Sequence, residues 1–203
     1  MSLFQKISDV LMTSLWMLTY TLVLVSTVKR RFPAVSPWTQ AFLTPLEVAV
    51  AVNCIVNIDR HSIYVVIAYV YWAAVEIAII AVSLRLGSVK RRIIPFYLLF
   101  IAGLTVLIYF FIGLDQGIFF SNYVNTVIGM ILWLIYIRRA DYKFNYLNLT
   151  VFILNFIAVL FCFPPYFGKF GHLGNVFIVA LAIINFLFIP VYLCKNRVTK
   201  LDS

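Results

Sequence analysis

The chain has 203 residues, of which 64% are hydrophobic and only 11% are charged. Soluble domains carry about 25% charged residues, so this composition excludes an ordinary soluble enzyme and indicates a membrane protein. The net charge of +9 does not indicate nucleic-acid binding, because the basic residues are gathered in short segments between long apolar runs.

Seven apolar segments follow one another along the chain, and about 20 apolar residues are enough for a helix to cross a bilayer. They cover residues 11–28, 38–57, 63–84, 93–112, 118–137, 148–168 and 175–194. Because they occupy nearly the whole chain, we predict one all-α, polytopic membrane domain over residues 1–203, a bundle of seven transmembrane helices. The first ten residues have neither a basic segment nor a cleavage site, so we expect no cleaved signal peptide.

Basic residues are unevenly divided between the two ends of the predicted bundle. Of the 16 lysines and arginines, 13 follow the first, third, fifth and seventh segments, and only Lys6, Arg60 and Lys169 lie at the other end. Cytoplasmic loops carry the excess of basic residues, which predicts an outside N-terminus and a cytoplasmic C-terminus. We therefore expect a multi-pass protein of a bacterial plasma membrane or a eukaryotic endomembrane, with the lipid bilayer as partner and no nucleic acid.

Two acids lie inside the predicted spans, where a charged side chain costs about 2.5–3.5 kcal/mol on insertion scales. Glu47 is near the middle of segment 38–57, and Glu76 lies slightly past the middle of segment 63–84. Helices that are adjacent in sequence usually pack side by side, so both acids are placed to open onto one cavity. The alternative is a protonated structural carboxyl that only bonds one helix to another.

Aromatic side chains accompany the acids. In segment 63–84, Tyr69, Trp72 and Glu76 recur at helical spacing and share one face. Trp16 and Tyr20 fall within the first span and are further candidates for lining a pocket. Three other aromatic residues, Trp38, Trp133 and Tyr192, are predicted at the membrane interface.

Amide side chains within the spans are also candidates for the pocket. They are Asn53, Asn125, Asn155 and Asn185. Interhelical hydrogen bonds are an equally good explanation of these amides, because such bonds are common between membrane helices. The cysteines and histidines show no spacing typical of a metal site or a redox motif, so we expect no metal and no cofactor.

Three motifs occur in a characteristic order. They are Trp-x-x-x-Tyr at Trp16 and Tyr20, Pro-Leu at Pro45 and Leu46, and Trp-x-x-x-acid at Trp72 and Glu76, and a later segment reads NYVNTVIGMILWLIYIRR. This arrangement resembles the small seven-helix membrane terpene cyclases of meroterpenoid pathways, of the pyripyropene and paspaline type. The resemblance covers most of the chain in topology and the three short motifs in residues.

The resemblance implies protonation-initiated cyclisation of a prenyl or epoxyprenyl, lipid-like substrate in an intramembrane pocket. The acids that act in protonation in that family correspond in position to Asn53 and Asn185, and an amide cannot deliver a proton. We therefore predict that Glu76 is the proton donor and Glu47 a second acid or the final base. The aromatic residues of the first and third spans would then stabilise the migrating cation.

A non-catalytic alternative is a small seven-helix carrier or binding protein for a lipid or vitamin-like solute. It would use the buried acids for proton coupling or to bind ligand amines, and helix kinks at Pro45 and Pro190 for gating. Many transporters are built from repeated halves, and no such repeat is visible here. A signalling partner of another membrane protein is a third alternative, and the sequence predicts no oligomeric state.

Overall fold

The computed structural model describes residues 2–35, 37–56, 58, 63–86, 126–139, 142, 145–161, 163, 168 and 171–201. Its helices are α1 (Leu3–Arg30), α2 (Pro37–Val56), α3 (Ile63–Arg85), α6 (Thr126–Ile137), α7 (Tyr146–Leu160) and α9 (Gly171–Leu201). No β-strand occurs in the described residues, so the predicted all-α fold is confirmed for them. The predicted span 93–112 and the first part of span 118–137 lie outside them.

Within the described residues, three helical segments are long and apolar enough to cross a membrane. They are Leu3–Arg30, Val66–Arg85 and Gly174–Lys195, and the helical segments Glu47–Val56, Thr126–Ile137 and Tyr146–Leu160 are apolar but shorter. Large apolar side chains on the long helices point outward, such as Ile77 at 53% exposure and Val176 at 62%. An outer surface of this kind is compatible with a membrane protein, as the composition predicts.

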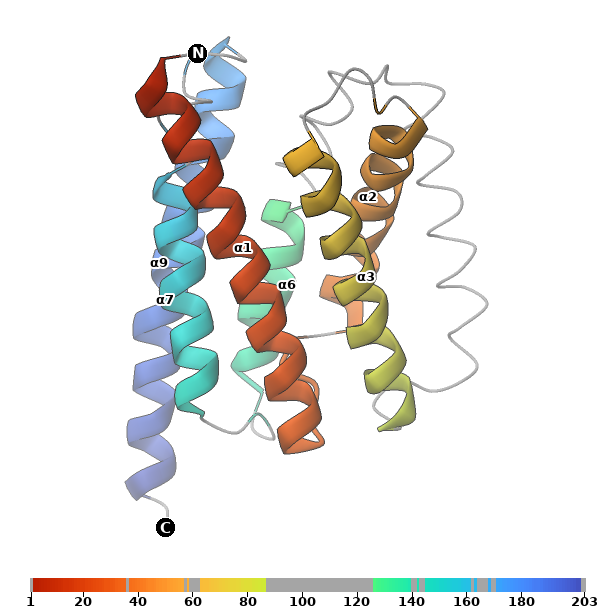
Figure 1. The fold of residues 1–203 in the computed structure, drawn as a ribbon. Helices are drawn as coiled ribbons and strands as arrows, with labels where there is room; N and C mark the ends of the chain where they lie inside the picture. The colour runs from red at the N-terminus through yellow and green to blue at the C-terminus, as the bar shows by residue number, and fades with distance from the viewer. Residues whose placement is uncertain are drawn as a thin grey trace.

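The helices alternate in direction through the bundle (Figure 1). α1, α3 and α9 run from the end that holds the N-terminus to the end that holds the C-terminus, and α2 and α7 run the opposite way. α1 packs against both α3 and α7, which places it between the α2–α3 pair and the α7–α9 pair. α6 contacts α2 and α9 and joins the two pairs behind α1.

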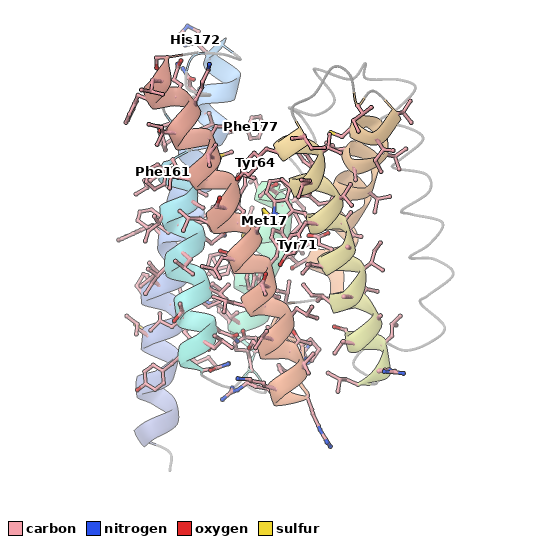
Figure 2. All side chains as sticks on the ribbon, in the orientation of Figure 1. Met17, Tyr64, Tyr71, Phe161, His172 and Phe177 are labelled. Atoms are coloured by element: carbon pink, nitrogen blue, oxygen red, sulfur yellow. The ribbon has the colours of Figure 1, made fainter. Side chains whose placement is uncertain are left out.

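Two hydroxyl pairs hold α1 against α3. Ser14 Oγ lies 3.0 Å from Tyr64 Oη, which itself donates to the carbonyl oxygen of Val10 at 3.0 Å. The hydroxyls of Thr21 and Tyr71 form the same contact seven residues further along both helices. About seven residues make two helical turns, so both pairs lie on one seam between parallel helices. Figure 2 shows Tyr64 and Tyr71 at this seam.

A buried hydrogen-bond network ties the C-terminal end of α1 to α6 and α7. Tyr142 Oη donates to the carbonyl oxygen of Ala34 at 3.0 Å and accepts from Asn148 Nδ2 at 2.7 Å. Ser26 Oγ donates to Asn148 Oδ1 at 2.5 Å. Trp133 Nε1 donates to the same Ala34 carbonyl at 3.0 Å, so Trp133 is buried within the protein and does not face the membrane interface.

We expect Tyr142→Phe to lower the free energy of unfolding by about 1–3 kcal/mol, because the buried Asn148 Nδ2 loses its acceptor. Burial raises the pKa of Tyr142 well above its usual value of 10.0. The unfolded chain therefore loses this proton first as the pH rises above about 10, and the folded state loses stability. The measurement is the free energy of unfolding in sodium dodecyl sulfate at about pH 8 and pH 11. Between these two pH values it should fall less in the variant than in the unaltered protein. An equal loss in both proteins would contradict this role.

Gly129 lets α6 approach α2 closely. A Cβ added at this glycine would lie 3.2 Å from Cγ and Cδ2 of Leu43. We expect Gly129→Ile to lower the free energy of unfolding by about 1–3 kcal/mol through overpacking. Gly129→Ala should lower the free energy of unfolding less than Gly129→Ile, because alanine favours the helix by about 1 kcal/mol relative to glycine. Adding Leu43→Ala to Gly129→Ile should recover part of the loss in the same assay, whereas strictly additive losses would contradict the contact.

Candidate functional site

The structure brings Glu47 and Glu76 together where α2 packs along α3. Glu76 has 0% of its surface exposed and Glu47 has 8%. The charge of Glu76 acts on the Glu47 carboxyl, as expected for two acids buried on helices that pack together. Two acids from neighbouring helices thus meet inside the protein.

The local sequence explains why both acids point inward. On α2, Thr44, Glu47, Ala51 and Cys54 recur every three or four residues and are all buried. On α3, the residues around Glu76 follow the same period, with Trp72, Ala73 and Ile79 buried as well. Each acid therefore belongs to the buried stripe of its own helix.

Aromatic rings from α1 and α3 border the acids. The rings of Trp16 and Trp72 meet edge to face, with centroids 6.0 Å apart, and Tyr69 meets Trp72 in the same way at 4.9 Å. The Tyr20 hydroxyl lies close enough to Glu76 to interact with its carboxyl group. We call Trp16, Tyr20, Thr44, Glu47, Tyr69, Trp72 and Glu76 the acid–aromatic cluster.

Most polar atoms of the acid–aromatic cluster lack a hydrogen-bond partner among the described residues. These atoms are both carboxyl oxygens of Glu76, Glu47 Oε2, Thr44 Oγ1 and Trp72 Nε1. The Thr44 and Tyr20 hydroxyls lie near the Glu76 carboxyl, but neither completes a hydrogen bond with it. An unpaired buried polar group costs about 1–3 kcal/mol, and most such groups in native proteins are paired. The cluster therefore offers donors and acceptors to a bound molecule.

Two of the four predicted amides pair with each other. Asn155 Nδ2 donates to Asn185 Oδ1 and lies 3.8 Å from Met130 Sδ, which links α7 to α9 and α6. Asn185 Nδ2 donates to a backbone carbonyl one turn earlier in its own helix at 2.8 Å. This geometry corresponds to the interhelical alternative for these two amides. Asn53 lies on α2, and Asn125 lies outside the described residues.

Comparison of the chain with protein-family models, with curated proteins and with solved structures finds no match. Among the described residues, no group of three or more His, Cys, Asp or Glu is placed to hold a metal ion. The chemistry available to the acid–aromatic cluster is the transfer of a proton and the stabilisation of positive charge by carboxyl groups and aromatic faces.

Thr44 is the one member of the acid–aromatic cluster that the sequence did not single out. Its spacing of three residues before Glu47 places both on one helix face, and this spacing was the available signal. Threonine is common in membrane helices, where its hydroxyl often bonds to the carbonyl one turn earlier. Thr19, Thr21 and Thr27 of α1 do so, whereas Thr44 Oγ1 has no such bond.

Proposed function

We propose that the protein is a membrane-embedded, terpene-cyclase-like isomerase that acts on a prenyl or epoxyprenyl, lipid-like substrate. The observation that carries this proposal is the pair of buried carboxyl groups, Glu47 and Glu76: Glu47 Oε2 and both oxygens of Glu76 have no hydrogen-bond partner among the described residues. The order of the Trp16–Tyr20, Pro45–Leu46 and Trp72–Glu76 motifs supports the same assignment by resemblance.

In this proposal Glu76 donates its proton to the epoxide oxygen or alkene of the substrate. The C–O bond of an epoxide breaks while the electron pair of a neighbouring alkene forms the new C–C bond. The carbocation that results is stabilised by the aromatic faces of Trp16 and Trp72. Glu47 removes a proton from carbon in the last step, so no proton is consumed overall and the product is an isomer of the substrate. Exclusion of water by the surrounding helices prevents early quenching.

The closest test feeds an epoxyprenylated aromatic compound to membranes that contain the protein. We expect a product of equal mass and new retention time, which membranes from cells without the protein do not form. Recovery of unchanged substrate across epoxyprenyl compounds of several chain lengths would contradict the proposal.

We further propose that the bundle crosses the membrane seven times, with the N-terminus outside and the C-terminus in the cytoplasm. Support comes from the termini, which lie at opposite ends of the bundle (Figure 1). The basic residues Lys29, Arg30 and Arg85 lie in the last turns of α1 and α3, which end on the same side.

The exposed Cys194 tests this orientation. In intact cells, a maleimide that cannot cross membranes should leave Cys194 unlabelled, and a permeant maleimide should label it, because the C-terminal end of α9 faces the cytoplasm in this proposal. A Cys194→Ala variant identifies the signal from this residue. Labelling by the impermeant reagent in sealed cells would contradict the proposed orientation.

The second candidate function is a carrier or binding protein for a lipid or vitamin-like solute. It is favoured by Pro190 inside α9 and Pro45 inside α2, because proline interrupts the helical hydrogen bonds and permits a hinge. Proteoliposomes should then take up a labelled hydrophobic compound that copurifies with the protein, without converting it. Conversion of that compound to an isomer would favour the cyclase instead.

A further inference from the structure

We infer that the acid–aromatic cluster also binds a lipophilic, monovalent ammonium ion, with its charged nitrogen between Glu47 and Glu76. This inference deepens the proposed function, on which it rests for the location of the site. A cyclase must hold positive charge on a reacting chain at this place, and an ammonium ion carries a positive charge of the same size.

The first step concerns the charge of the site. Glu47 and Glu76 are buried where α2 packs along α3, and two ionised carboxyl groups held together away from water repel each other, so a bound cation is balanced by the loss of one proton from the pair. The groups that act on the two carboxyls are each other and the hydroxyls of Thr44 and Tyr20. No lysine or arginine is among these neighbours in the described part of the chain. One monovalent cation therefore neutralises the site.

The second step concerns hydrogen bonds. Both oxygens of Glu76 and Oε2 of Glu47 are buried acceptors without partners in the part of the chain that the structure describes. Thr44 is 1% exposed, and its hydroxyl lies near the Glu76 carboxyl and also has no partner among the described residues. A protonated tertiary amine supplies one N–H donor to these oxygens, which a neutral apolar ligand cannot do.

The third step concerns the choice among monovalent cations. Trp72 lies one helical turn before Glu76 on α3 and its ring contacts those of Trp16 and Tyr69, and aromatic rings favour organic ammonium ions through cation–π attraction. Glu76 lies within the long apolar segment Val66–Arg85, so its surroundings favour a ligand that carries an alkyl chain. A strongly hydrated alkali ion has no alkyl chain and gains less from the aromatic rings.

The test measures binding of tritiated N,N-dimethyldodecylamine, which is protonated at neutral pH, to the protein in nanodiscs. Protein-free nanodiscs give the lipid background, and tritiated dodecanol is the neutral analogue of equal chain length. We expect saturable binding of about one amine per chain and none of dodecanol. Glu76→Gln and Glu47→Gln should each weaken binding at least tenfold, whereas Asp9→Asn, which removes a carboxyl of α1 outside the cluster, should not.

Competition experiments on the unaltered protein keep the test valid if a variant fails to fold. Unlabelled amine should displace the label, and 0.5 M sodium chloride should not. Equal binding of dodecanol, displacement by sodium, or full affinity in correctly folded Glu76→Gln would each overturn the inference. Saturable amine binding without isomerisation would support the inference and contradict the proposed activity. Isomerisation without amine binding would support the proposed activity and overturn the inference.

Discussion

Glu76→Gln is expected to lower the rate of isomer formation by at least about 100-fold, the size of effect typical of a lost general acid. Glutamine has almost the same size and keeps the buried face of α3 filled, but an amide does not donate an acidic proton. The measurement is the rate of product formation by purified protein in nanodiscs, with folding verified by circular dichroism and gel filtration.

Two matched variants sharpen this result. Asp9→Asn makes the same carboxyl-to-amide change on α1, outside the acid–aromatic cluster, and should keep the rate within about twofold. Glu47→Gln should alter the last step, so that water-quenched alcohols replace part of the alkene product. A Glu76→Gln protein that forms the isomer at the normal rate would exclude Glu76 as the proton donor.

Glu76→Met is expected to raise the free energy of unfolding by about 1–3 kcal/mol while it abolishes activity. Methionine has a similar volume, and it removes two buried oxygens that have no hydrogen-bond partner among the described residues. Replacement of buried charged groups by apolar residues of similar size is often stabilising. The measurement is the midpoint of unfolding in sodium dodecyl sulfate without added ligand.

Asn155→Leu is the control, because it should change the free energy of unfolding in the opposite direction. Its amide is paired with Asn185 Oδ1, so its loss leaves a buried acceptor unpaired and should destabilise the protein by about 1–3 kcal/mol. The comparison separates two explanations of a buried polar residue in a membrane helix: a hydrogen bond between helices and a binding site for another molecule. A strong loss of stability in Glu76→Met would show that Glu76 bonds one helix to another, contrary to the proposed site.

The positions of the helices could largely be predicted from the apolar runs, but their ends could not. α1 begins at Leu3, well before the predicted residue 11, because Ser2 and Gln5 form a capping box. α7 spans Tyr146–Leu160, shorter than the predicted 148–168, and Asn145 caps its first turn. Hydropathy averages over a window, so it does not register single capping residues.

The candidate site could be predicted where it depends on adjacent helices. Glu47 and Glu76 lie on helices that are neighbours in sequence and pack together. Helical spacing placed Trp72 on the same face of α3 as Glu76. The Asn155–Asn185 pair could not be predicted, because the apolar pattern does not give the rotation of α7 against α9. Tyr192 was predicted at the interface, but its hydroxyl binds the backbone of Asn145 and the side chain is buried. Distant contacts of this kind depend on packing.

The most direct measurement of the central claim is an experimental structure of the protein in a lipid nanodisc, at a resolution that shows bound molecules. We expect non-protein density within hydrogen-bond distance of a Glu76 carboxyl oxygen and in contact with Glu47, bordered by Trp16 and Trp72. Carboxyl oxygens fully bonded to side chains of the protein, with no bound molecule beside them, would contradict the claim.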